Sequence, residues 1–298
     1  MSYHLPVLLE STIDGLNIKP NGIYVDLTYG GGGHSKAILS KLKNGKLFAF
    51  DQDADTLSNK IDDNRLTFIN QNFKYVKKFL KLYGVEKVDG VLGDLGVSSY
   101  HFDKSIRGFS TRFDGDLDMR MNQSQSHTAK DVVNDYGIKD LTLLFKKYGE
   151  LKNASAISNS IDVFRSKKSI STTNDLKEAV KKNLPNHKSN KVLAKIFQAI
   201  RIEVNQELKA LEEMLLQLID IVKSGGRIII ISYHSLEDRI VKNFIKKGKI
   251  YGEIEKDIYG NYELPFIAIN NKPITPQKDE LKINSRSRSA KLRIAERI

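Results

Sequence analysis

The sequence predicts an α/β fold in which a parallel sheet, covered by helices on both faces, is interrupted by an all-helical insertion. Two observations support this prediction. Short apolar strands alternate with amphipathic helices over the first hundred residues, a pattern typical of a parallel sheet. Strand patterns then disappear and return only at Arg227–Ser232. We therefore expect one discontinuous domain, residues 1–121 with 201–298, and a helical domain at 122–200.

The individual elements follow from the spacing of apolar residues. The expected strands are short and apolar, and cover 22–28, 46–51, 66–69, 88–94 and 227–232, with a basic last strand at 290–297. The expected helices are amphipathic, and cover 34–42, 75–82, 129–136, 141–148, 173–183 and 236–247. An apolar stripe from Leu193 to Val222 predicts one long helix that ends at Gly225-Gly226.

Composition narrows the class of protein. The N-terminus has no basic region before its apolar residues, so we expect no secretory signal there and a cytoplasmic protein. The chain has no cysteine, which excludes disulfides, cysteine zinc sites and thiolate nucleophiles; no metal site is predicted. A net charge of +12 suits a partner made of phosphates. A lysine-rich composition inherited from an AT-rich genome is the alternative explanation.

A glycine loop joins the first strand to the first helix. Four glycines, Gly30–Gly33, precede His34, and glycine lets a ligand approach the backbone at the N-terminus of a helix. The dinucleotide fingerprint needs a sixth-position glycine where this chain has Ser35. Asp51 ends the next strand, where a carboxylate can accept both ribose hydroxyls. The glycine loop and Asp51 are equally compatible with NAD and with S-adenosylmethionine.

Asp94, at the end of the fourth strand, indicates which of these two ligands is bound. A carboxylate is useful beside an adenine or a sulfonium, and has no evident task beside a nicotinamide. The sequence therefore favours S-adenosylmethionine. The alternative is that Asp94 caps the loop that follows it, as Asp often does in turns.

Eight segments, taken in order, resemble one known family. They are His4–Glu10, Gly32–Ser35, Asp89–Ser99, Arg107–Ser110, Leu117–Met121, Phe197–Leu208, Ile231–Arg239 and Asn284–Arg293. Together they span nearly the whole chain and resemble the bacterial 16S rRNA cytosine-N4 methyltransferases of the MraW type. Each segment alone is a weak signal, but eight in the same order are specific.

The resemblance implies a Rossmann-like S-adenosylmethionine methyltransferase domain with an inserted helical domain that recognises RNA. It implies S-adenosyl-L-methionine as cofactor, and a cytidine in the decoding region of 16S rRNA in the small ribosomal subunit as target. The residues that it places at the cofactor are Gly32, Gly33, His34, Asp51, Phe73 and Asp94. His101 stands where the family usually has glutamine, and we carry that position over as a cofactor contact. Ordinary core burial is the alternative for Phe73.

The chemistry of the target indicates candidate catalytic residues. The lone pair of a cytosine amine is delocalised into the ring, so acceptors that hold its hydrogens help it react. Asp94 and the following loop, with Ser98, are expected to supply them. His234 follows the fifth strand and is a candidate proton acceptor, with a structural role as the alternative. Methylation at C5 needs a covalent adduct, normally with a thiolate, so the absence of cysteine favours N or O methylation.

Basic and aromatic residues indicate where RNA binds. Aromatic rings stack on bases and Arg binds phosphate. The candidates are Arg107, Phe109, Arg112 and Arg120 in one loop, and Arg286 and Arg288 in the tail. Packing of the loop and solvation of the tail are the alternatives. Relatives carry basic residues after Tyr148-Gly-Glu, where this chain does not; Arg165, Lys167 and Lys168 are the expected replacement, or a solvated loop.

Two other functions remain open from the sequence. One is a methyltransferase that acts on another RNA, on DNA or on a small amine; DNA enzymes of this kind usually carry Asp-Pro-Pro-Tyr where this chain has Asp94-Leu-Gly-Val. The other is a non-catalytic RNA-binding module, against which Gly32, Asp51 and Asp94 argue as an intact set. No membrane partner is expected, and the oligomeric state, a homodimer included, stays open.

Overall fold

The computed structural model describes residues 6–96, 107–254 and 256–298. The chain forms two compact units, Met1–Gly96 with Leu208–Ile298 and Val97–Glu207. Each unit has a hydrophobic core of its own. Among the described residues, no helix is long and apolar enough to cross a membrane.

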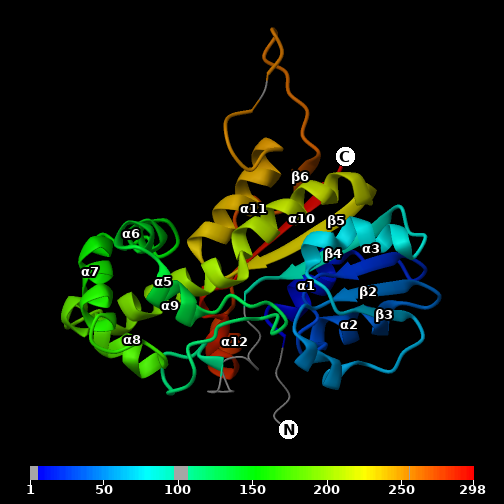
Figure 1. The fold of residues 1–298 in the computed structure, drawn as a ribbon. Helices are drawn as coiled ribbons and strands as arrows, with labels where there is room; N and C mark the ends of the chain where they lie inside the picture. The colour runs from blue at the N-terminus through cyan, green and yellow to red at the C-terminus, as the bar shows by residue number, and fades with distance from the viewer. Residues whose placement is uncertain (1–5, 97–106, 255) are drawn as a thin grey trace. The chain divides into compact units, whose positions relative to one another are not determined.

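A seven-stranded sheet in the order β3-β2-β1-β4-β5-β7-β6 forms the centre of the first unit (Figure 1). Its strands are β1 Ile23–Asp26, β2 Lys46–Phe50, β3 Leu66–Ile69, β4 Val88–Asp94, β5 Val222–Ser232, β6 Phe266–Ala268 and β7 Lys291–Arg297. The first five in this order are parallel, and β7 runs antiparallel to both β5 and β6. The α/β fold is confirmed, and the expected parallel sheet is found over five strands, with the antiparallel β7 making the whole sheet mixed. The strand order reverses between β1 and β4, which is where ligands bind in such sheets.

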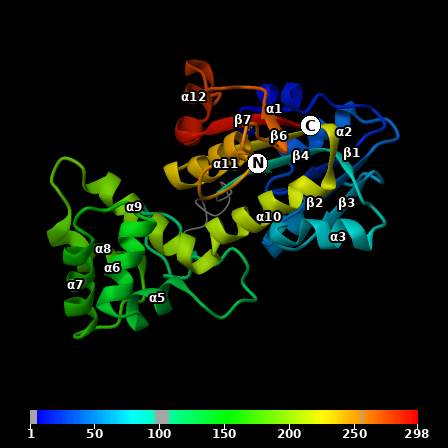
Figure 2. The ribbon, with the colours of Figure 1, turned by 90° about the horizontal axis from the view of Figure 1, so that it is seen from above.

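Helices cover both faces of this sheet (Figure 2). They are α1 Leu9–Leu16, α2 Gly33–Lys41, α3 Val76–Leu82, α10 Glu207–Ile221, α11 Ser235–Lys247 and α12 Lys278–Ile283, with 3-10 turns η1 Ala54–Asn59, η2 Phe73–Tyr75 and η5 Ser285–Ser289. Side chains of α1 and α2 share one core with the sheet, and those of α3, α10 and α11 share the other. The layers are those of a Rossmann-like fold.

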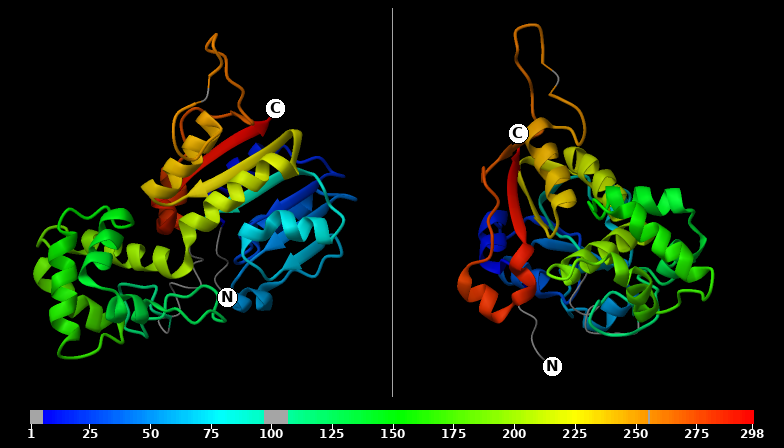
Figure 3. Two further views of the ribbon diagram at one scale, coloured as in Figure 1. Left: turned by 45° about the horizontal axis from the view of Figure 1, so that its top comes forward. Right: turned by 90° about the vertical axis from the view of Figure 1, so that its left-hand side faces the viewer.

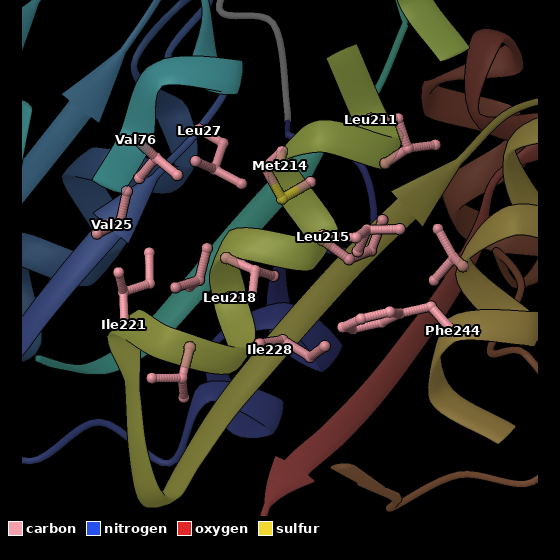
Figure 4. Close-up of a cluster of buried hydrophobic side chains, with 14 of the residues drawn as sticks. Val25, Leu27, Val76, Leu211, Met214, Leu215, Leu218, Ile221, Ile228 and Phe244 are labelled. Carbon is pink, nitrogen blue, oxygen red and sulfur yellow. The ribbon is translucent and has the colours of Figure 1, made fainter. Parts of the chain in front are cut away.

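Strand β5 shows why its sequence is continuously apolar. Ile228 and Ile230 belong to the core under α10 and α11, whereas Ile229 and Ile231 belong to the core under α1 and α2. All four are fully buried, because neighbouring residues of a strand point to opposite faces and both faces are covered. Figure 4 shows Leu215 and Leu218 of α10 and Phe244 of α11 beside Ile228. Each such buried side chain contributes about 2 kcal/mol.

The prediction of one long helix that ends at Gly225-Gly226 was wrong. The stripe forms two helices, α9 Ser189–Asn205 and α10, separated by Gln206 in the left-handed conformation, with a φ of 51°. Helix α10 ends at Ile221, and both glycines lie in β5, where its pairing with β4 shifts register. A Cβ on Gly226 would lie 3.0 Å from the carbonyl oxygen of Asp89. The glycine thus permits close strand approach.

The second unit is helical in the part that the structure describes. It contains α5 Ala129–Asp135, α6 Ile138–Lys147, α7 Ala154–Arg165, α8 Thr173–Val180, the 3-10 turn η4 Lys181–Asn183, and α9. Capping boxes of Thr128 with Asp131 and of Thr172 with Asp175 begin α5 and α8. The sequence did not predict α7. Buried residues of the preceding loop, among them Phe109 and Met119, belong to the core of this unit, so the loop packs with the helices.

Candidate cofactor and catalytic site

Hydrogen bonds to the neighbouring strands fix the glycine loop between β1 and α2. The N–H of Leu27 donates to the carbonyl of Leu92 on β4, and the N–H of Tyr29 donates to that of Phe50 on β2, both at 2.8 Å. Gly32 has a φ of 74°, and a Cβ there would lie 2.7 Å from the Tyr29 hydroxyl. A Cβ on Gly31 would meet nothing within 4 Å. One side of the loop is therefore open, while Gly32 must be glycine.

Asp51 lies against this loop, as the sequence predicts for a cofactor site. One carboxylate oxygen accepts the N–H of Gly30 at 2.8 Å, and the other accepts the N–H of Asp53 at 2.9 Å. The carboxylate thereby joins the end of β2 to the glycine loop. Because each carboxylate oxygen can accept more than one hydrogen bond, the geometry is compatible with a hydroxyl-bearing ligand at the same group.

Asp94 ends β4 and contacts residues from three other segments. Its N–H donates to Thr28 Oγ1 at 2.7 Å, and its Oδ1 accepts the Tyr233 hydroxyl at 2.7 Å. His34 Nδ1 lies 3.9 Å from its Oδ2. The glycine loop, the start of α2 and the residue after β5 thus converge on one carboxylate. Tyr233 is a site residue that was not predicted from the sequence, although its position directly after a parallel strand was a usable signal.

The electrostatics of this group follow from its burial. Burial raises the pKa of Asp94 to about 6, against the lowering effects of His34 and of the Tyr233 hydroxyl. Burial, together with the neighbouring Asp94, raises the pKa of Tyr233, so its hydroxyl stays protonated and donates. A carboxylate with a pKa near neutrality is a suitable proton acceptor at physiological pH.

Asp26 and His34 hold the start of α2 in place. Asp26 is fully buried; its carboxylate accepts the Ser35 hydroxyl at 2.7 Å and the N–H of Thr28 at 3.1 Å. Burial raises the pKa of Asp26. His34 Nε2 lies 3.0 Å from the carbonyl oxygen of Val7, an acceptor, so Nε2 donates a hydrogen bond there, and Nδ1 faces Asp94. These contacts orient the helix end beneath the loop.

His234 caps α11 rather than facing an open space. Its Nδ1 accepts the N–H of Glu237 at 3.4 Å, and the Glu237 carboxylate accepts the N–H of His234 at 3.3 Å and of Tyr233 at 2.9 Å. The His234 side chain is only 9% exposed. This arrangement is a capping box, and it agrees with the structural role that the sequence left as the alternative.

The remaining cofactor candidates differ in how the structure places them. A Cβ on Gly33 would lie 2.3 Å from the Pro6 ring, so this glycine permits the N-terminal segment to approach. Phe73 begins η2 and packs half-buried against the core. Ser98 and His101 lie outside the described residues.

Most of the loop residues predicted to bind RNA have partners within the second unit. Arg107 is buried and donates to the carbonyls of Arg120 and Met121, and Phe109 belongs to the helical core. Arg120 forms an ion pair with Asp118 at 2.8 Å. Arg112 is exposed.

Of the other basic candidates, two arginines are exposed and one is hydrogen-bonded to backbone carbonyls. In the first unit, Arg286 and Arg288 are exposed on η5. In the second unit, Arg165 Nη1 donates to the carbonyls of Val133, Asn134 and Tyr136, at 2.9, 3.0 and 2.7 Å. It thereby satisfies carbonyls at the end of α5.

Asn205 connects the same loop to α9, and we expect Asn205→Ala to destabilise the second unit. Its side chain is buried; Nδ2 donates to the Met119 carbonyl and Oδ1 accepts the Met121 N–H, both at 2.7 Å. Alanine leaves both buried groups without these partners, at a cost of about 2–4 kcal/mol. Thermal denaturation measures the loss. Asn190→Ala, an exposed change on the same helix, is the control, and equal melting temperatures for the two variants contradict the prediction.

The sheet is Rossmann-like, with a glycine loop after β1 and carboxylates after β2 and at the end of β4. These features define a class of protein, the enzymes that bind a nucleoside-containing cofactor at this edge of the sheet. The MraW methylase family model matches residues 1–298, and the chain belongs to this family. A relative from Flavobacterium johnsoniae is 58% identical, covering 100% of this chain and 99% of the relative. One from Christiangramia forsetii is 55% identical with the same coverage. Both are named ribosomal RNA small subunit methyltransferase H.

Membership settles the class of reaction and the cofactor. The chain is an S-adenosylmethionine-dependent methyltransferase. The residues fit this cofactor, because the loop is open at Gly31 and the Asp51 carboxylate lies against Gly30.

Proposed function

We propose that this enzyme methylates the N4 exocyclic amine of a cytidine in 16S rRNA of the small ribosomal subunit, in the decoding region that the family resemblance implies. The names of its relatives support an rRNA substrate. The observation that carries the chemistry is Asp94, a partly buried carboxylate with a pKa of about 6 at the end of β4, held by Tyr233 beside the glycine loop.

The cofactor residues are assigned from the family resemblance and from their positions in the fold. Gly32, Gly33 and His34 form the loop and helix start that bind the cofactor, and Asp51 accepts its ribose hydroxyls. Phe73 packs beside the adenine, and His101 takes the place of the family glutamine. When bound, S-adenosylmethionine supplies a methyl group activated by its sulfonium.

Asp94 acts on the target amine. By accepting a hydrogen of the amine, the carboxylate draws the lone pair out of conjugation and receives the proton that the nitrogen must lose. Ser98, in the loop after β4, is proposed as a second acceptor. His234 holds the start of α11, so we assign it a positioning role. Since the sequence contains no cysteine, a thiolate adduct at C5 is not available.

RNA is proposed to contact the helical unit and the exposed arginines. Arg112, Arg286 and Arg288 are exposed and suited to phosphate. Arg107, Phe109 and Arg120 contribute by holding the shape of their loop, as their hydrogen bonds and burial support.

The Tyr233 hydroxyl gives a testable pH effect. We expect kcat/KM to rise with pH through about 6, where Asp94 ionises. Tyr233→Phe removes a hydrogen bond that favours the ionised form, and the midpoint should move upward by about one unit, because hydrogen bonds to charged groups contribute about 1.5–3 kcal/mol. Steady-state rates across pH measure this. Tyr83→Phe, at an exposed residue, is the control. An unchanged midpoint in Tyr233→Phe rules out its role in positioning Asp94.

The substrate class is tested by supplying methyl-labelled S-adenosylmethionine with unmodified small subunits, protein-free 16S rRNA, duplex DNA and free cytidine. We expect label in the ribosomal substrates and none in DNA or cytidine. Label in DNA would replace the proposed substrate, and absence of label in all four, with no cofactor binding by calorimetry, would contradict the proposal.

A further inference from the structure

The segment between α11 and β6, residues 250–265, exposes apolar side chains. Figures 1 and 3 show it, in orange, extending away from α11 and β6. Ile258 is 92% exposed and Tyr259 82% exposed, the two highest values among the large hydrophobic residues that the structure describes. Tyr251 and Tyr262 in the same segment are also exposed. Large apolar side chains gathered on a protruding segment indicate an interaction surface.

A network of hydrogen bonds holds the tip of this 250–265 loop. The N–H of Asp257 donates to the Asn261 carbonyl at 2.9 Å, and the N–H of Gly260, whose φ is 86°, donates to the Asp257 carbonyl at 3.0 Å. The Asp257 carboxylate accepts the N–H groups of Tyr259 and Asn261, both at 2.8 Å. Ile258 and Tyr259 therefore lie at the corner of a formed turn. A partner that binds them has little backbone left to order.

The charge of the loop is opposite to that of the chain. Residues 250–265 contain four acids, Glu253, Glu255, Asp257 and Glu263, and one base, Lys256, whereas the whole chain has a net charge of +12. Of these acids, Glu253 forms an ion pair with Lys247 of α11 at 3.0 Å. Lys256 itself lies 6.0 Å from the ring of Tyr262. The three other acids and Lys256 leave a charge of minus two, which repels nucleic-acid phosphates. It attracts a positively charged protein surface.

We propose that the 250–265 loop docks on a basic protein surface of the assembled small subunit, with Ile258 and Tyr259 entering an apolar pocket and the acids contacting the basic rim. Aromatic anchors surrounded by charge are typical of protein interfaces. The proposal rests on the proposed function for the identity of the particle. It adds that the enzyme recognises protein in that particle as well as RNA.

Photocrosslinking tests which partner contacts the tip. Tyr259→p-benzoylphenylalanine is introduced into the full chain, which is illuminated alone, with small subunits, and with protein-free 16S rRNA. We expect one discrete crosslink to a basic protein of the subunit and none to RNA. The same crosslinker at Tyr83, another exposed tyrosine of the first unit, is the control. Adducts to RNA, a crosslink between two copies of the enzyme, or the same products from both positions would overturn the proposal.

Binding measurements separate this inference from the catalytic proposal. Sedimentation with small subunits should show that Ile258→Ser with Tyr259→Ser weakens binding at least tenfold, as expected for anchor residues. The melting temperature and the affinity for protein-free rRNA should not change, because both side chains are exposed. Glu263→Lys should also weaken binding to subunits. Tighter binding of Glu263→Lys would identify RNA as the partner and overturn the proposal. None of these measurements requires methyl transfer, so a failure of the proposed reaction would be detected separately.

Discussion

Asp94→Asn is expected to lower kcat by about three orders of magnitude, within the range of about 10²–10⁴ that a positioned general base contributes. Asparagine keeps the size of the side chain and can still accept the Tyr233 hydroxyl, but it cannot take a proton from the amine. Single-turnover methyl transfer to small subunits measures the effect, with S-adenosylhomocysteine binding as the check that the site is intact. A variant that retains more than a tenth of the wild-type rate would remove Asp94 from the chemistry.

The same variant should be more stable than the wild type at pH 8 and not at pH 4. The folded-state pKa of Asp94 is raised to about 6, so its contribution to stability is fully present below the unfolded pKa and is lost as the pH rises through 6. Two pKa units correspond to at most about 3 kcal/mol. Chemical denaturation at the two pH values measures it, and Asp279→Asn, at an exposed carboxylate, is the control. A difference in unfolding free energy between Asp94→Asn and the wild type that does not depend on pH would contradict the cost assigned to burying the ionised Asp94 carboxylate.

Gly32→Ala is expected to weaken cofactor binding at least tenfold. Its φ of 74° costs an L-residue about 1–2 kcal/mol, and the added Cβ meets the Tyr29 hydroxyl at 2.7 Å. That hydroxyl cannot move freely, because it donates to the Asn59 carbonyl at 2.7 Å and accepts the Ile61 N–H at 2.9 Å. The variant therefore distorts the loop itself.

Calorimetry with S-adenosylhomocysteine measures this loss, and the neighbouring Gly31→Ala provides the comparison. Because the Gly31 methyl meets nothing within 4 Å, we expect the wild-type melting temperature in that variant. Unchanged affinity in Gly32→Ala would show that the loop is not the cofactor site.

The central strands of the sheet could be predicted closely from the sequence because they are buried on both faces, whereas the short edge strand β6 was not predicted. The bounds of β3 and β4 match the prediction, since polar residues bound the apolar residues of each strand: Arg65 and Asn70 at β3, and Lys87 and Asp94 at β4. The prediction of one long helix was wrong because the helical spacing of apolar residues continues across Gln206, where the backbone turns. Helix α7 was missed because its three serines and two alanines weaken the apolar pattern, although Ile157 and Ile161 are fully buried.

The candidate site was predictable where its residues lie at the ends of parallel strands. The glycine loop, Asp51 and Asp94 were placed at one edge by topology alone, and the hydrogen bonds to Gly30 and Thr28 agree with that placement. The direction of a side chain is not encoded in spacing. The hydrogen bond from Tyr233 to Asp94, the capping role of His234 and the burial of Arg107 therefore emerged only from the structure.

The central claim is that Asp94 serves transfer of a methyl group to the exocyclic amine of a cytidine in small-subunit rRNA. The most direct test is to digest the labelled rRNA to nucleosides and identify the methylated product by mass spectrometry, for the wild type and for Asp94→Ala. The account predicts N4-methylcytidine with the wild type and its loss with the variant. Label in 5-methylcytidine or in a ribose methyl group, or N4-methylcytidine that persists at the wild-type level in Asp94→Ala, would contradict it.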